Sequence, residues 1–354
     1  MSRFFSGKYS ALTPYVPGEQ PRDRKFVKLN TNESPFPPSP KAVQAAELAA
    51  KSVQLYSDPS CRALRETAAA LYGVKSDNVI CTNGSDEILS FAFAAFCDDG
   101  NPAVFCDVTY GFYKVFAAFH RVPATVIPLK EDLTADVNAL KEARGTLFIA
   151  NPNAPTGLAL GLDDIEALAA SDPERAVVID EAYVDFGGDS AIPLVKRYPN
   201  LLVTRTFSKS RSMAGARLGL GIADASLIAD LETLRYSTNP YNINSVTLAM
   251  GKAALEDEEY TKKNCRTIAE NREFLIAKLR ELGFFVTDSK ANFVFCRHNS
   301  LSGEEIYTRL RQRGVLVRHF DEPRIRDFNR ITVGSREECG ILIKELETVL
   351  GGAE

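Results

Sequence analysis

The sequence predicts a three-layer α/β fold, in which helices cover both faces of a mostly parallel sheet, followed by a smaller α+β domain. Three observations lead to this prediction. Short, continuously apolar runs alternate with helical segments between residues 78 and 206, which is typical of a parallel sheet buried on both faces. Polar residues directly follow several of these runs. Beyond residue 257 a long amphipathic helix and isolated strands favour a second domain.

The composition is that of an ordinary globular protein. The chain has 354 residues, of which 45% are hydrophobic and 25% charged, enough for about two domains. Its formal net charge of -4 leaves no basic excess to hold a nucleic-acid backbone. Residues 1–26 carry charges and prolines where a signal peptide has an apolar core, and no later segment is apolar enough to cross a membrane. We expect a cytoplasmic protein without nucleic-acid or membrane partners.

The cysteines and histidines do not indicate a metal centre. The seven cysteines are scattered and never spaced as a CxxC pair, which predicts reduced core thiols rather than disulfides or a zinc site. The three histidines also lie far apart in the sequence. We therefore expect no metal, and we expect a lysine to be available as a general base.

The chain is expected to begin with an arm over residues 1–40, which is rich in proline and turn residues and cannot form regular helix. A disordered tail is the alternative, but the aromatic and apolar residues within the segment favour an arm that packs on the small domain or on a partner subunit. The large domain is predicted over residues 41–256 and the small domain over residues 257–354.

Within the large domain, strands and helices are expected to alternate. Helices are predicted at 41–51 and 61–72, strands at 78–82, 103–106, 124–129, 146–150, 176–180 and 201–206, and helices at 88–97, 110–119, 134–143 and 163–170 between them. Ligands of such sheets bind beyond the carboxyl ends of the strands. Four polar residues at these ends are therefore predicted to converge: Ser85, Asn153, Asp180 and Lys209.

The remainder is richer in helix. Helices are predicted at 227–236, 244–255, 258–282, 303–313 and from the last strand to residue 350, and strands at 284–287, 292–295, 315–318 and 330–333. Helices on one face of a small sheet make a plausible second domain.

Residues 83–87, which read Asn-Gly-Ser-Asp-Glu, form the first strand-to-helix junction. A helix that begins here directs free N–H groups and the positive end of its dipole at whatever lies above it, which suits a phosphate. The alternative is a capped helix without a ligand.

Further along, Asp180 closes an apolar strand, where a carboxylate is costly to bury unless it meets a cation or a donor. A protonated pyridine is such a cation, and Tyr183 could bond the phenolic oxygen of the same ring; a structural aspartate that caps the next turn is the alternative.

Lys209 is the candidate nucleophile. It follows the β-prone run 203–206 and lies among hydroxyl residues, and small residues come directly after it. A solvated lysine after a strand is the alternative for any single lysine. The distant motifs described above favour the functional interpretation.

Taken together, these motifs resemble the fold-type I aminotransferases that use pyridoxal 5'-phosphate. The resemblance is carried by residues 83–87, 151–157, 180–183 and 206–209 and by Arg217, in the family's order and at about its spacing. Segments 12–15, 32–35, 56–59 and 330–334 are similar to the histidinol-phosphate aminotransferase branch in particular, so the resemblance covers nearly the whole chain.

The resemblance implies a role for each matched residue. Lys209 would bind the cofactor covalently and move a proton, and Asp180 and Tyr183 would complete the catalytic group. Tyr110 would stack on the cofactor ring. The phosphate would be held by Gly84, Ser85, Asp86, Thr206, Ser208 and Arg217. The enzyme would be a homodimer in which Tyr56 reaches the partner's active site.

One position departs from the family pattern. The asparagine that precedes the second proline of the 151–157 loop and bonds O3′ of the cofactor is Ala154 here, with Asn153 one residue earlier. Either Asn153 or Tyr183 is expected to supply that contact. Without it, the bond between lysine and cofactor would lose about 1 kcal/mol of hydrogen bonding.

The expected substrates are L-histidinol phosphate and 2-oxoglutarate, giving imidazole-acetol phosphate and L-glutamate. The resemblance implies that Arg330 holds the substrate phosphate with help from Tyr15 and Arg318, and that Asn32 also binds substrate; a guanidinium suits a phosphate or a carboxylate equally well. A surface ion pair is the alternative for either arginine.

Four other functions remain open from the sequence. An aromatic amino acid aminotransferase or a threonine-phosphate decarboxylase would share the fold. A nicotinamide-dependent oxidoreductase would fit the alternating elements, but the glycines of residues 215–221 lack the GxGxxG spacing and come late in the chain. A non-catalytic binding protein would not need both Lys209 and Asp180.

Overall fold

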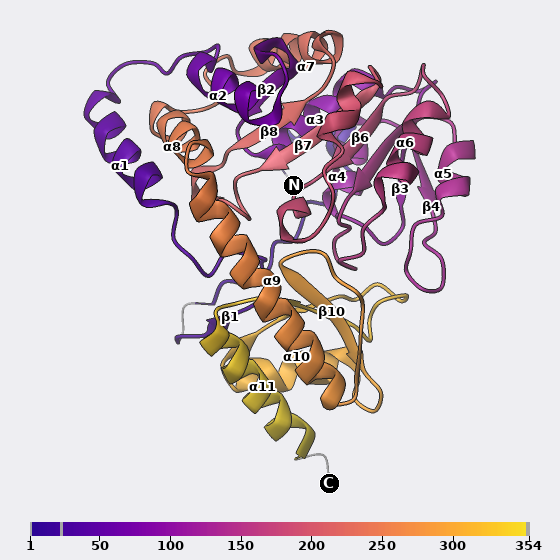
Figure 1. Ribbon diagram of the computed structural model, residues 1–354. Helices are drawn as coiled ribbons and strands as arrows, with labels where there is room; N and C mark the ends of the chain where they lie inside the picture. The colour runs from indigo at the N-terminus through magenta and orange to yellow at the C-terminus, as the bar shows by residue number, and fades with distance from the viewer. Residues whose placement is uncertain (1, 22–23, 352–354) are drawn as a thin grey trace.

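The computed structural model describes residues 2–21 and 24–351. Figure 1 shows two bodies, a larger one built around a broad sheet and a smaller one below it, with the long helix α9 (Glu258–Glu281) running from one into the other. No helix of the described residues is both long and apolar enough to span a membrane. The domain boundary at 256/257 stays a prediction, and the start of α9 at Glu258 supports it.

The large body contains a seven-stranded sheet, which confirms the predicted α/β class. Its strands follow the spatial order β2 (Val79–Thr82), β8 (Gly219–Ile222), β7 (Leu201–Thr206), β6 (Val177–Asp180), β5 (Thr146–Ala150), β3 (Ala103–Cys106) and β4 (Ala124–Ile127). The pairings from β7 through β4 are parallel, whereas β8 runs antiparallel to both β2 and β7. The sheet is therefore mixed but mostly parallel.

Helices cover both faces of this sheet because its strands are apolar on both sides. Along β6, Val178 faces a cluster with α3 (Ser85–Phe96), α4 (Phe112–His120) and α7 (Ala225–Thr238). Its neighbours Val177 and Ile179 face a second cluster, which includes residues of α2 (Arg62–Tyr72), α5 (Val137–Glu142), α6 (Leu162–Ala170) and α8 (Ser245–Leu255). Helix α1 (Pro40–Ala49) packs on α8. Each fully buried aliphatic side chain contributes about 1.5–3 kcal/mol.

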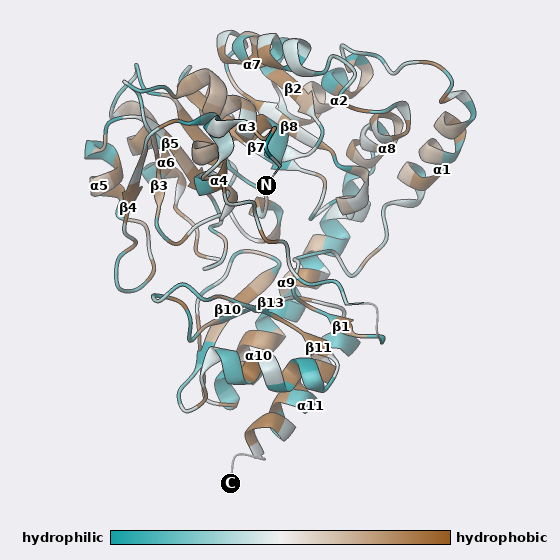
Figure 2. Ribbon diagram, turned by 180° about the vertical axis from the view of Figure 1, so that it is seen from behind, coloured by the Kyte–Doolittle hydropathy of each residue, from teal (hydrophilic) through white to brown (hydrophobic). Residues whose placement is uncertain are grey.

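The small body has a four-stranded antiparallel sheet in the order β12 (Arg318–His319), β13 (Asn329–Thr332), β10 (Phe293–His298) and β9 (Phe284–Val286). It packs with α9, α10 (Gly303–Gln312) and α11 (Arg336–Gly351) around one core. In Figure 2 helices such as α10 alternate between hydrophobic and hydrophilic residues, as amphipathic helices do. The small body also takes in part of the N-terminal arm, because β1 (Val27–Lys28) pairs with β11 (Val315–Leu316) in parallel.

Two local features differ from the sequence analysis. No strand is predicted around the glycine-rich run 215–221, yet β8 begins within it at Gly219 and ends at Ile222. A Cβ at Gly219 would lie 2.4 Å from the backbone nitrogen of Ser85, so β8 passes directly beneath the start of α3. Residues 315–318 were predicted as one strand, but they divide between β11 and β12, which belong to different sheets. All seven cysteines are buried and unpaired, as predicted.

Candidate active site

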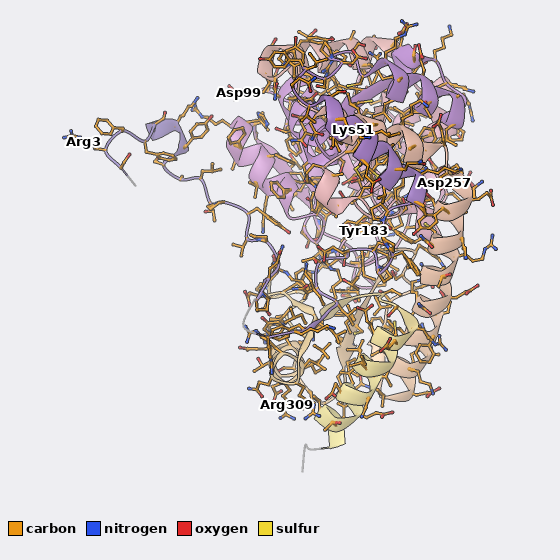
Figure 3. All side chains as sticks on the ribbon, turned by 90° about the vertical axis from the view of Figure 1, so that its left-hand side faces the viewer. Arg3, Lys51, Asp99, Tyr183, Asp257 and Arg309 are labelled. Carbon is orange, nitrogen blue, oxygen red and sulfur yellow. The ribbon has the colours of Figure 1, made fainter. Side chains whose placement is uncertain are left out.

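A cavity of about 960 Å³ lies between the two bodies, beyond the carboxyl ends of β5, β6 and β7. Figure 3 shows Tyr183, one of its lining residues, at this junction. The cavity brings together most of the predicted site: Tyr15, Asn32, Ser85, Asp86, Tyr110, Asp180, Tyr183, Thr206, Ser208, Lys209, Arg217, Arg318 and Arg330. Residues from both bodies and from the arm therefore line the same cavity.

Lys209 follows β7 and extends toward segment 30–33. Its Nζ donates a hydrogen bond to the carbonyl of Thr31 at 3.3 Å and lies 5.7 Å from the centroid of the Tyr183 ring. No carboxylate of the described residues lies within ion-pair distance of this amine. An amine held by a single carbonyl can exchange that contact for a bond to a carbonyl compound.

Asp180 closes β6 inside the protein, with 5% of its surface exposed. Its Oδ1 accepts a hydrogen bond from Thr204 at 3.0 Å, and its Oδ2 accepts one from the hydroxyl of Tyr113 at 3.3 Å. Burial raises the pKa of this carboxyl to about 6, and the nearby charge of Asp86 adds to the rise. A cation beside Asp180 would relieve this cost.

Tyr183 is fixed by Asn32, which lies within the arm of residues 1–40. Asn32 donates a hydrogen bond from Nδ2 to the Tyr183 hydroxyl at 3.0 Å, while its own Oδ1 accepts one from Thr332 at 3.1 Å. Asn32 has a φ of 54°, a left-handed conformation that asparagine tolerates better than most residues. The buried amide therefore connects β13 of the small body to a tyrosine of the large body.

An anion site lies at the start of α3. The N–H groups of Ser85 and Asp86 belong to the first helical turn and have no acceptor within the helix. Arg217 approaches from the other side, with Nη1 3.3 Å from Ser208 Oγ and Nη2 3.3 Å from Asp86 Oδ2. A Cβ at Gly84, whose φ is 86°, would lie 2.7 Å from the Arg217 guanidinium. A side chain here would push the guanidinium away and would strain a backbone whose positive φ favours glycine.

Tyr110 lies between the cradle and the buried aspartate. Its hydroxyl donates to Asp86 Oδ1 at 2.8 Å, and its ring meets the ring of Tyr113 edge-on at 5.7 Å. Burial, followed by the charge of Asp86, raises the pKa of Tyr110 well above its usual range. The phenol therefore stays neutral and presents an aromatic face to the cavity.

Two arginines converge at the small-body end of the cavity. Arg318 and Arg330 are directly paired across β12 and β13, so both side chains lie on the same face of the sheet. Arg330 donates from Nη2 to the carbonyl of Asn30 at 3.2 Å, and its buried Nε has no partner among the described residues. Burial lowers the pKa of Arg330. Two adjacent guanidinium groups with a free buried donor suit a dianion.

The family model described as aminotransferase class I and II matches residues 24–346. The chain belongs to this family. This aminotransferase is 47% identical over 350 residues to histidinol-phosphate aminotransferase 1 of Bradyrhizobium diazoefficiens, and the match covers 99% of this chain and 100% of that protein. It is 46% identical to histidinol-phosphate aminotransferase of a Marinomonas species, with the same coverage. Histidinol-phosphate aminotransferase from Sinorhizobium meliloti in complex with pyridoxal-5'-phosphate shares the fold, at a TM-score of 0.90 and 24% identity over 100% of this chain and 99% of that one.

Three predicted cofactor residues do not line the cavity of this aminotransferase: Gly84, whose place beside Arg217 is described above, Asn153 and Tyr56. Asn153 accepts a hydrogen bond from Thr109 at 2.8 Å and donates to Val108 and Thr156, both at 3.0 Å, so its amide connects its own loop to the loop after β3. The expectation that Asn153 bonds O3′ of the cofactor in place of residue 154 therefore has no support in the geometry. Tyr56 is 84% exposed and stacks on Tyr241 at 4.6 Å.

The sequence interpretation also missed residues of the aminotransferase site. Thr31 contacts Lys209, and Thr204 and Tyr113 hold Asp180. Tyr113 lies one helical turn after Tyr110, and Thr204 lies two residues before Thr206, so spacing from predicted residues was the available signal. Thr31 had no such signal, because its role comes from its backbone carbonyl.

Proposed function

We propose that this aminotransferase uses pyridoxal 5'-phosphate to transfer the amino group of L-histidinol phosphate to 2-oxoglutarate, giving imidazole-acetol phosphate and L-glutamate in histidine biosynthesis. The relatives of 46–47% identity over their full length support this reaction. The observation that carries the proposal is the presence of two anion sites in one cavity. The cradle at α3 suits the cofactor phosphate, and the Arg318–Arg330 pair suits a second phosphate.

The residues present fit the cofactor. The close approach of Gly84 to Arg217 leaves a cradle lined by the first N–H groups of α3 and by Ser208. Burial raises the pKa of the Asp180 carboxyl, because its charged form has left water without meeting a cation. A pyridinium would supply that cation. Arg217, the α3 amides, Thr206 and Ser208 would hold the phosphate, and Asp180 and Tyr183 would hold the ring.

When bound, pyridoxal phosphate supplies an aldehyde that condenses with amines and a ring that accepts electrons. Lys209 would hold this aldehyde through Nζ, and its freed amine would move the proton between the substrate Cα and C4′ of the cofactor. Asp180 would keep the proton on the ring nitrogen, because an ionised carboxylate in a buried site is stabilised by an adjacent cation. Tyr183 would donate to the phenolic oxygen, and Asn32, which donates to the Tyr183 hydroxyl, would orient it.

The substrate would lie with its phosphate against Arg318 and Arg330. Tyr15 reaches this end of the cavity from the arm, and Asn32 lies beside Tyr183. In the second half-reaction a carboxylate of 2-oxoglutarate would use the same guanidinium pair, since a guanidinium binds both anions. A cytoplasmic location is part of this proposal.

A homodimer is part of this proposal, with Tyr56 contributing to the partner's active site. Tyr56 and Leu55 are 84% and 67% exposed, and Val53 and Leu48 are each 60% exposed on the same stretch. Such a run of exposed apolar side chains is typical of a protein interface. Figure 3 also shows Arg3 on an N-terminal segment that extends outside both bodies.

Two experiments test the proposal. Reduction of the holoenzyme with borohydride, followed by peptide mapping, should place a pyridoxyl adduct on Lys209; an unmodified Lys209 would refute the cofactor assignment. Turnover of histidinol phosphate, phenylalanine and threonine phosphate should then be compared with 2-oxoglutarate as the acceptor, scoring threonine phosphate for decarboxylation as well. Histidinol phosphate should have the highest kcat/KM, and a preference for phenylalanine would overturn the substrate assignment.

A further inference from the structure

The N-terminal arm crosses the cavity from one body to the other within a few residues. The ring of Tyr15 stacks on Phe112, the first residue of α4 in the large body, at 4.4 Å. Four residues later Glu19 contacts α10 in the small body. Residues 15–19 therefore form a bridge over the cavity, and the position of Tyr15 depends on how this bridge is anchored.

Glu19 is the anchor of this bridge. Its Oε1 accepts a hydrogen bond from Tyr307 at 2.8 Å, and its Oε2 accepts one from Arg311 Nε at 2.9 Å. Tyr307 and Arg311 lie one turn apart on the same face of α10. The backbone carbonyl of Glu19 also accepts a hydrogen bond from Asn30 Nδ2 at 2.9 Å.

No other side chain in the described part of segment 11–21 makes a hydrogen bond or ion pair. The Glu19 carboxylate is partly enclosed, with 28% of its side chain exposed. Two charge-assisted bonds in such a site hold a segment more firmly than an exposed ion pair does.

The bridge also packs against the residue that contacts the candidate Schiff-base lysine. A Cβ on Gly18 would lie 2.8 Å from Cγ2 of Thr31, so the arm backbone lies directly on Thr31. The carbonyl of Thr31 accepts the hydrogen bond of Lys209. Release of Glu19 would therefore loosen the outer wall of the cavity at the level of Lys209 as well as the contact of Tyr15.

We propose that Glu19 is a positioning residue for the phosphate-bearing substrate: by fixing the arm to Tyr307 and Arg311, it holds Tyr15 over the site of Arg318 and Arg330. This inference rests on the proposed function. The anchor acts on the rim of the cavity and leaves the cradle and Asp180 untouched. It therefore affects recognition of the substrate phosphate more than proton transfer at Lys209.

The first experiment compares the kinetics of Glu19→Ala, Glu19→Gln and a matched control, Glu304→Ala. Glu304 is an exposed glutamate in the first turn of α10 that has no hydrogen-bond or ion-pair partner among the described residues. The KM for histidinol phosphate should rise about tenfold in Glu19→Ala, while kcat stays within about threefold. Glu19→Gln should recover part of the loss because its amide oxygen still accepts hydrogen bonds. The KM for glutamate should rise less, and Glu304→Ala should match wild type.

The second experiment follows the arm itself and does not depend on the substrate. The chain contains no tryptophan, so Val16→Trp places a single fluorophore on the arm at a residue that is 69% exposed. In the holoenzyme, its fluorescence anisotropy should fall when Glu19→Ala or the pair Tyr307→Phe and Arg311→Met is added. Adding that pair to Glu19→Ala should cause no further fall, because all three substitutions remove the same contact.

The outcomes separate the two proposals. If wild type does not turn over histidinol phosphate, the proposed function fails, and the anisotropy still decides whether Glu19 anchors the arm. Unchanged anisotropy in Glu19→Ala would overturn the anchor. Lower anisotropy with an unchanged KM would overturn its role in recognition. An equal fall in kcat for both substrates together with a lower Tm would show a purely structural role and also overturn the proposal.

Discussion

Replacing Asp180 by asparagine should change how the stability of the cofactor-free chain depends on pH. Burial raises the pKa of this carboxyl from 3.8 to about 6 in the folded state. The folded protein therefore binds the proton more tightly than the unfolded chain. The free energy of unfolding must fall as the pH rises through this window, because the buried carboxylate becomes charged.

The size of this change in the free energy of unfolding follows from the rise in the pKa of Asp180. A rise of roughly two pKa units corresponds to about 3 kcal/mol once the group is ionised in both states. Because part of that loss is already present at pH 4.5, the change between pH 4.5 and 7.5 is about 2 kcal/mol. Asparagine does not titrate, so Asp180→Asn should lack this component.

The assay is urea unfolding of the cofactor-free chain at pH 4.5, 6 and 7.5, followed by circular dichroism. Asp180→Asn should gain about 2 kcal/mol relative to wild type across this range, and the exposed control Asp99→Asn should run parallel to wild type. Addition of pyridoxal phosphate should stabilise wild type at pH 7.5 far more than Asp180→Asn. If the free energies of unfolding of wild type and Asp180→Asn differ by the same amount at all three pH values, burial does not raise the pKa of Asp180 as described above.

Three further substitutions test other parts of the site. Lys209→Ala should lower kcat by on the order of 10³-fold or more, since both the cofactor bond and the base are lost; measurable adduct formation after borohydride reduction would contradict this. Gly219→Ala should cost about 1–3 kcal/mol and weaken phosphate binding, because its Cβ would lie 2.4 Å from the Ser85 nitrogen; an unchanged Tm and Kd would show that α3 can shift freely. Arg205→Met should cost about 3–5 kcal/mol in urea unfolding, because it leaves Glu181, now 3.1 Å from the guanidinium, buried without its cation. Adding Glu181→Gln should recover much of that loss, and a lack of recovery would argue against this cause.

The parts of the site that follow a strand could be predicted from the sequence. Lys209, Asp180 and Ser85 each come directly after an apolar run, and parallel strands bring their carboxyl ends to one edge. The strand β8 could not be predicted, because its alternating glycines are set by close packing under α3 rather than by strand propensity. The contacts of Asn153 likewise depend on partners distant in sequence, such as Thr109.

The segment of residues 29–32, which contacts the candidate catalytic residues Lys209 and Tyr183, belongs to the small body. Its residue Leu29 accepts a hydrogen bond from the backbone of Thr332 at 2.9 Å, and Asn32 is bonded to the side chain of the same threonine. Two residues of this segment face the large body: Thr31 meets Lys209, and Asn32 meets Tyr183. Any shift of the small body relative to the large sheet must therefore change a contact of Lys209 and a contact of Tyr183 together. Because Arg318 and Arg330 lie on the same small sheet, we expect an anion that draws these arginines inward to move the Thr31 carbonyl that contacts Lys209 as well.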